Sequence, residues 1–315
     1  MATPTPPPAP PGSAAPNGHG APYGHQAPSY GQQPYAQPYP PQPGMPGAQP
    51  AHPAQPAQFG VPGPAHPHFG RILLSEWTKI RTVRSTTWTL LVMATIIIGM
   101  AAIVGGSANP NTDPDTTVTL SLIGVMIAQI AAASLGVLTI SAEYTTGMIR
   151  STLTAYPRRV SVLAAKAVVF AAIMFVVGLV SCTLAYLLGD AMMSSEVARE
   201  PTNSDIVRGL VGSAVYLALI GLFSLGIGTM LRHSAGAITT VLGLMLLPSM
   251  FGGFVPGKLG EAISHYNPMN LLLKMIAGAG DVGGKIEPWP GMLLMAVYAG
   301  ASLIGGAILL RSRDV

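Results

Sequence analysis

The residues best suited to chemistry or recognition form a charged, hydroxyl-rich island between two long apolar runs, from Ile140 to Arg159. Glu143 lies near its start. Its basic side chains are Arg150, Arg158, Arg159 and, shortly after it, Lys166. An arginine or lysine at the centre of a bilayer costs about 2.5 to 3.5 kcal/mol. We therefore expect this segment to lie in water or against protein.

An apolar stripe runs through the same island. Ile149, Leu153 and Tyr156 recur at positions i, i+4 and i+7, which is one face of a helix. Thr145 or Thr146 can cap the start of such a helix. The pattern predicts a short amphipathic helix with basic flanks, which is typical of a docking element for a soluble partner.

Other patterns that resemble binding or metal sites do not meet the requirements of such sites. Gly252 to Lys258 matches the opening of a phosphate-binding loop, but Leu259 occupies the Ser/Thr position that magnesium needs, and no strand precedes it. The histidines occur singly, and Cys182 is the only cysteine, so neither a metal site nor an intrachain disulfide is indicated. We expect no catalytic centre, metal or cofactor in this chain.

Apolar helices must position the island. The chain is 49% hydrophobic and 9% charged, whereas soluble domains are about a quarter charged. Runs of about 19 to 23 residues, at about 1.5 Å per residue, cross a hydrocarbon core of about 30 Å. Six such runs, none containing Asp, Glu, Lys or Arg, lie near residues 87–105, 118–140, 167–188, 210–230, 235–255 and 291–310. The sequence predicts an all-α integral membrane protein with six transmembrane helices.

Charge predicts the orientation. If both chain ends face the cytoplasm, the inner side holds eleven basic and three acidic residues, a net +8. The outer side then holds five basic and nine acidic residues, a net −4. This split follows the positive-inside rule. We expect a multi-pass plasma-membrane protein with cytoplasmic termini, and the basic surplus gives no reason to expect a nucleic-acid partner.

The chain before the first run divides into two parts. Residues 1–68 contain no Lys, Arg, Asp or Glu and are rich in Pro, Gly, Ala and Gln, which predicts a disordered cytoplasmic tail. A polyproline or Tyr/Gln ligand for a partner is the second interpretation of this tail. Residues 69–315 form the predicted membrane domain.

An interfacial helix is expected at the start of that domain. Phe69, Leu73, Trp77 and Ile80 share one helical face, with Trp77 at headgroup depth. Glu76 falls within this apolar face, so it either snorkels to water or pairs with a basic residue of another segment. We expect Glu143 to stay ionised and to pair with a basic residue of its own loop or of this helix.

A further short helix is expected in the long loop before the last run. Asn267 and Pro268 can start it, and Gly278 can stop it. Either it lies on the surface as an amphipathic helix or it dips into the bilayer.

Three motifs resemble bacterial type-2 ATP-binding-cassette (ABC) exporter permeases. The first, similar to their cytoplasmic loop, is Glu143-Tyr144-Thr145-Thr146-Gly147-Met148-Ile149-Arg150-Ser151-Thr152-Leu153, followed by Pro157-Arg158-Arg159. The others are Ser75-Glu76-Trp77-Thr78-Lys79-Ile80-Arg81 and Arg311-Ser312-Arg313-Asp314. The resemblance covers about residues 69–315.

The resemblance implies a transporter subunit that is not itself an enzyme. A separate ATPase would bind ATP and magnesium and dock on the loop at residues 141–166. Two permeases, identical or different, would form the substrate pathway, and a pair of short outer helices would dip into the bilayer. The docking positions are Glu143, Tyr144, Thr146, Gly147, Ile149, Arg150, Leu153, Tyr156, Arg158 and Arg159. The interfacial-helix positions are Glu76, Trp77, Lys79 and Arg81.

Two other functions compete with this one. An ion-coupled secondary transporter usually carries ionisable residues within its spans, and the six predicted runs contain none. A membrane-anchored scaffold that acts through its proline-rich tail would leave the island without a role.

Overall fold

The computed structural model describes residues 69–107, 117–149, 152, 159–193, 201–278 and 286–312. The tail at residues 1–68 lies outside these ranges. Every regular element within them is a helix, and six segments are long and apolar enough to cross a bilayer. The all-α membrane fold with six spans is therefore confirmed.

The spans follow the predicted runs closely. They are α2 (Arg84–Ser107), α3 with α4 (Thr117–Leu122 and Val125–Thr145), α6 (Arg159–Met193), α7 (Asn203–Leu231), α8 with the 3-10 turn η1 (Ser234–Phe251 and Gly252–Phe254) and α11 (Pro288–Ser312). The second run, predicted as continuous, breaks before α4 at Gly124. A Cβ there would lie 2.8 Å from Cβ of Met100 on α2, so α2 approaches too closely for a side chain.

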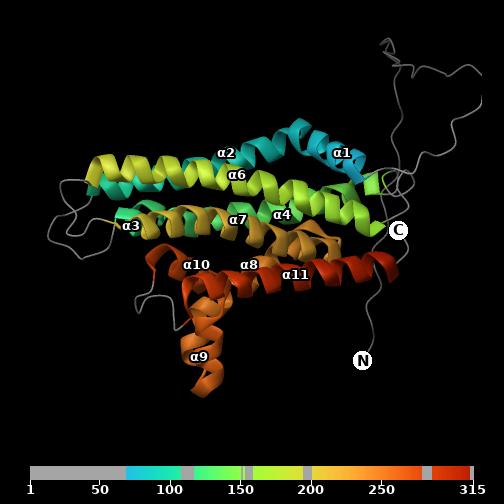
Figure 1. Ribbon diagram of the computed structural model, residues 1–315. Helices are drawn as coiled ribbons and strands as arrows, with labels where there is room; N and C mark the ends of the chain where they lie inside the picture. Colours follow the sequence, from blue (N-terminus) through green and yellow to red (C-terminus); the bar gives the residue numbers. More distant parts are fainter. Residues whose placement is uncertain are drawn as a thin grey trace, which may run out of the picture. The chain divides into compact units, whose positions relative to one another are not determined.

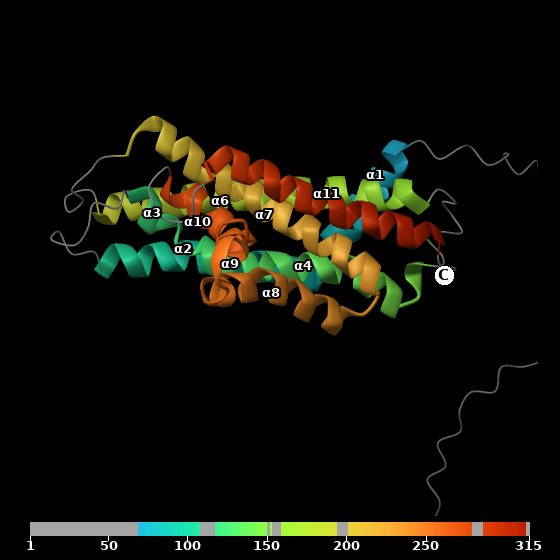
Figure 2. The same cartoon turned by 90° about the horizontal axis from the view of Figure 1, so that it is seen from below.

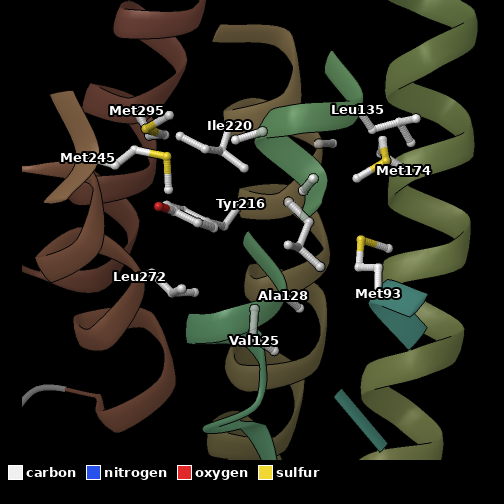
Figure 3. Close-up of a cluster of buried hydrophobic side chains, with 14 of the residues drawn as sticks. Met93, Val125, Ala128, Leu135, Met174, Tyr216, Ile220, Met245, Leu272 and Met295 are labelled. Carbon is white, nitrogen blue, oxygen red and sulfur yellow. The ribbon is translucent and has the colours of Figure 1, made fainter. Parts of the chain in front are cut away.

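The helices pack as a bundle around α7 (Figures 1 and 2). In α7, 67% of the most apolar stretch is buried, against 22% in α2. Its neighbours are α4, α6 and α11. Figure 3 shows Tyr216 and Ile220 of α7 within a cluster of buried apolar side chains from α4, α8 and α11. Tyr216 also donates a hydrogen bond to Oε1 of Gln129 at 2.7 Å, which satisfies its buried hydroxyl group.

Two short helices precede α11, namely α9 (Gly257–His265) and α10 (Pro268–Ala277). The predicted limits of α10 are confirmed, because the Asn267 side chain caps it through the Asn270 amide and Gly278 ends it. Leu271, Leu272 and Met275 are fully buried. α10 therefore packs into the bundle and is not a surface helix, whereas α9 projects sideways from it (Figure 1).

The predicted interfacial helix is α1 (Phe69–Thr82), separated from α2 by Val83. Several elements meet at its end of the bundle, which we call the α1 end: α1, the last turn of α4, the first turns of α6 and the last turn of α11 (Figure 1). The segments predicted to be cytoplasmic that the structure describes thus lie together.

Candidate functional site

The face of α1 that packs on the bundle carries Glu76. Ile72, Glu76 and Ile80 are buried, whereas Phe69 and Trp77 are 46% and 47% exposed. The prediction placed the most hydrophobic residues on one face. The carboxylate of Glu76, which the prediction placed within that face, points at the protein, where charged partners are available.

Glu76 belongs to a cluster of four charged side chains from three helices. On α6, Lys166 Nζ lies 2.6 Å from Glu76 Oε2 and 2.9 Å from Glu143 Oε1 of α4. On α1, Lys79 Nζ lies 2.7 Å from Glu76 Oε1 and 3.0 Å from the same Glu143 oxygen. Two positive and two negative charges therefore compensate one another. We call these four residues the charge cluster.

Most of the charge cluster is shielded from solvent. The side chains of Glu76 and Lys166 are 1% and 2% exposed, and that of Glu143 is 7% exposed. Ions this deeply buried must be paired, because removing one partner of a buried pair costs about 3 to 5 kcal/mol. Of the two possibilities for Glu76, the structure shows pairing and not snorkelling. The predicted pairing of Glu143 with the interfacial helix is confirmed through Lys79.

Lys79 connects the charge cluster to the island. Its Nζ donates to Thr152 Oγ1 at 3.4 Å, and its side chain is 24% exposed. Burial lowers the pKa of Lys79, but the hydrogen bond to Glu76 and the negative charges of Glu143 and Glu76 outweigh it and raise the pKa above its ordinary value. Lys79 therefore carries its charge throughout the physiological pH range.

The start of the island differs from the prediction in the role of its two threonines. α4 continues to Thr145, and the hydroxyls of Thr145 and Thr146 donate back to the carbonyl of Ala142 at 3.1 and 2.7 Å. They close the last turn of α4, and the described residues Met148, Ile149 and Thr152 beyond Gly147 are again helical, as the predicted short helix requires. Gly147 follows with φ +70°, a conformation that suits glycine and turns the chain out of α4.

The docking residues predicted in the island fall into four groups. Ile149 is only 5% exposed, so its side chain packs within the chain, whereas the prediction had it facing a docked partner. Arg159 starts α6 and donates to the carbonyl of Leu310 on α11 at 3.1 Å. Four of them lie in the last turn of α4 or directly after it, namely Glu143, Tyr144, Thr146 and Gly147. The remaining four lie outside the described residues, namely Arg150, Leu153, Tyr156 and Arg158.

Tyr144 joins the end of α4 to a second neighbour. The guanidinium carbon of Arg232, in the α7–α8 turn, lies 5.3 Å from the centre of the Tyr144 ring. A cation over an aromatic face at this distance is attractive. Glu143 thus ties α4 to α1 and α6, while the next residue ties it to the α7–α8 turn.

Sequence reasoning missed two members of this site. From the sequence alone, Lys166 serves only as a charge that excludes lipid, and Arg232 is only one of the eleven basic residues assigned to the inner side. For Lys166, a useful signal is its position next to an apolar run and at the end of the loop that was expected to supply a basic partner for Glu143. For Arg232, nothing in the sequence indicated that its partner would be Tyr144.

Within the described ranges, no three His, Cys, Asp or Glu side chains are placed to hold a metal ion. The ion pairs link the end of α4 to the start of α6 and to α1.

Comparison with known proteins does not place the chain in a family. No family model matches it, and no curated protein matches it significantly. Its function must therefore be inferred from its own residues and geometry.

Proposed function

We propose that this chain is the membrane-spanning permease subunit of an ATP-driven exporter. A separate ATPase would dock on the segment between α4 and α6 at residues 141–166, and two permeases would form the pathway. ATP and magnesium would bind to the ATPase. The motifs of the island and of α1, which resemble type-2 ABC exporter permeases, are the starting point for this proposal.

The observation that carries the proposal is the direct ion pair between Glu143 and Lys166, 2.9 Å apart. Glu143 lies near the start of the docking segment and Lys166 is its last residue, so the ion pair joins the two ends of the segment. Glu76 and Lys79 attach these ends to α1. A loop that is anchored in this way can pass a displacement from a docked partner to three helices at once.

The orientation in this proposal rests on charge. The α1 end carries most of the basic residues, so the positive-inside rule places it in the cytoplasm, where a soluble ATPase can reach it. The membrane would then be the plasma membrane, and both chain termini would be cytoplasmic.

Affinity purification of the full-length chain from its native membranes tests the proposal. We expect an ATPase with a complete phosphate-binding loop to co-purify with the wild type and to be lost with Leu153→Asp. Leu231→Asp is the matched control, because Leu231 is exposed at the end of α7, beside the α7–α8 turn. Equal recovery of the ATPase with both variants at equal membrane abundance would defeat the docking assignment.

Ion-coupled secondary transport remains a second candidate because of the charge cluster. The predicted runs contained no ionisable residue, but α4 and α6 extend beyond those runs and include Glu143 and Lys166. Buried ionisable groups in membrane proteins often serve ion or proton coupling. Flux in sealed vesicles separates the two functions: export should require ATP and persist when the ion gradients are collapsed.

A further inference from the structure

A second surface feature lies where α1 meets α2. Trp77 and Trp88 are 47% and 67% exposed, and Arg81 and Arg84, between them in sequence, are also exposed. We call these four residues the α1–α2 corner. None of them has a role in the charge cluster.

The exposed charge of the α1–α2 corner is exclusively positive. Glu76 is the only acidic residue in α1 and α2, and it is buried in the charge cluster. Lys79 is neutralised by the carboxylates of that cluster. The uncompensated charges of the two helices are therefore those of their arginines, and the surface is complementary to an anion.

The corner also lies at the depth of a membrane surface. α2 is the first candidate span and starts at Arg84. The two arginines are therefore placed where the hydrocarbon region ends. Tryptophan is enriched at this depth because its ring is apolar and its N–H group is polar.

An apolar groove adjoins the corner on the side of α6. It has a volume of about 380 Å³, and its lining includes Leu73, Leu74 and Trp77 of α1 with Val168 and Ala172 of α6. Leu74 and Val168 are themselves well exposed. The cationic corner therefore continues into an apolar surface, which is the polarity profile of a phospholipid.

We propose that the α1–α2 corner binds the headgroup of an anionic phospholipid. Arg81 and Arg84 contact the phosphate, the two tryptophans lie at headgroup depth, and an acyl chain lies along the groove between α1 and α6. This proposal does not depend on the exporter function, because it requires only that α2 spans the bilayer.

Quenching of Trp77 fluorescence tests the proposal. In the full-length chain with Trp88→Phe and Trp289→Phe, Trp77 is the only tryptophan. The protein is placed in nanodiscs that contain equal fractions of brominated phosphatidylglycerol or brominated phosphatidylcholine in the same background lipid. We expect stronger quenching by the anionic lipid, with the preference falling about fivefold for each arginine that is replaced.

The variants separate charge from folding. Arg81→Gln with Arg84→Gln should abolish the preference, whereas Arg81→Lys with Arg84→Lys should keep it. Arg311→Gln, which removes an exposed charge at the end of α11, should leave it unchanged. A chain with Trp289 alone, at the start of α11, should show no preference.

Three results would overturn the proposal. Equal quenching by both lipids would show that the corner does not select charge. Absence of quenching by either lipid would show that protein covers α1. Loss of the preference in inorganic phosphate, but not in chloride of equal ionic strength, would show a site for free anions and not for a lipid headgroup.

Discussion

At the scale of single residues, Lys166 is the most constrained side chain of the charge cluster. Its ammonium group contacts carboxylates from two other helices and is almost fully buried. We expect Lys166→Met to lower the free energy of unfolding by about 3 to 5 kcal/mol, because both carboxylates lose a buried partner. Lys79→Met should cost only about 1 to 2 kcal/mol, since Lys79 is partly exposed and water can replace some of its contacts.

Equilibrium unfolding in detergent, followed by circular dichroism, measures both losses. Lys258→Met is the control, because Lys258 is exposed on α9, and it should change the free energy by less than about 0.5 kcal/mol. Equal losses of unfolding free energy for Lys79→Met and Lys166→Met would mean that the deeper burial of Lys166 does not increase its contribution to stability.

Arg232 has two separable contributions, one from its side chain and one from its backbone. Its φ is 55°, a left-handed conformation that costs a non-glycine residue about 1 kcal/mol or more. Arg232→Ala removes the contact with Tyr144 and keeps the strain, so it should destabilise the protein by about 1 kcal/mol. Arg232→Gly removes both and should be more stable than Arg232→Ala by about 1 kcal/mol.

Thermal unfolding of the two variants and the wild type gives this order. If the alanine variant matches the glycine variant, the α7–α8 turn relaxes out of the left-handed conformation when the arginine is lost. Thermal unfolding of Tyr144→Leu should then give the contribution of the contact between Arg232 and the Tyr144 ring to stability.

At the scale of elements, the sequence predicted the limits of α1 but not its orientation. A 3.6-residue period places residues on a common face, but it does not say which face meets protein. In a membrane protein, both faces of such a helix can be satisfied, one by lipid and one by the bundle. The partners of Glu76 decide the rotation, and they come from α4 and α6, far away in the sequence.

The end of α4 shows a similar limit. The hydroxyl groups of Thr145 and Thr146 can either cap a following helix or bond back to the preceding turn, and both options use common local geometry. The structure takes the second option, and Gly147 then turns the chain. Local sequence alone does not separate these two outcomes.

Above neutral pH, the attachment of α1 to the bundle should weaken only under strongly alkaline conditions. The pKa of Lys79 is raised above 10.5. Its stabilising contribution is therefore complete below that ordinary value and is lost as the pH rises through the raised pKa. We expect the difference in unfolding free energy between the wild type and Lys79→Met to be constant from neutral pH up to 10.5 and to shrink above it.

Unfolding experiments on both proteins in the same detergent, across a series of buffers, check this. A difference that already falls between neutral and mildly alkaline pH would contradict the raised pKa. It would indicate that Lys79 is less well paired in solution than in the structure.

At the scale of the whole molecule, the six spans were predictable because length and apolar composition are sufficient to identify them. The central position of α7 was not. α7 and α11 have the same mean hydropathy of 2.1, yet 67% of the α7 window is buried and only 28% of the α11 window. Lipid and protein interior are equally apolar, so hydropathy cannot tell which helix lies at the centre.

The topology is the prediction that concerns the whole chain. Six spans place the α1 end and the α9 side on opposite sides of the membrane, and the charge distribution assigns the α1 end to the cytoplasm. With Cys182→Ser as the background, Lys258→Cys should react with a membrane-impermeant thiol reagent in intact cells. Arg311→Cys and Arg150→Cys should react only after permeabilisation. Lys258 and Arg311 are both exposed basic residues, so their difference reports the side of the membrane and not accessibility. Labelling of Arg150→Cys in intact cells would show that the topology is the reverse of the predicted one. An intracellular ATPase could then not dock on residues 141–166.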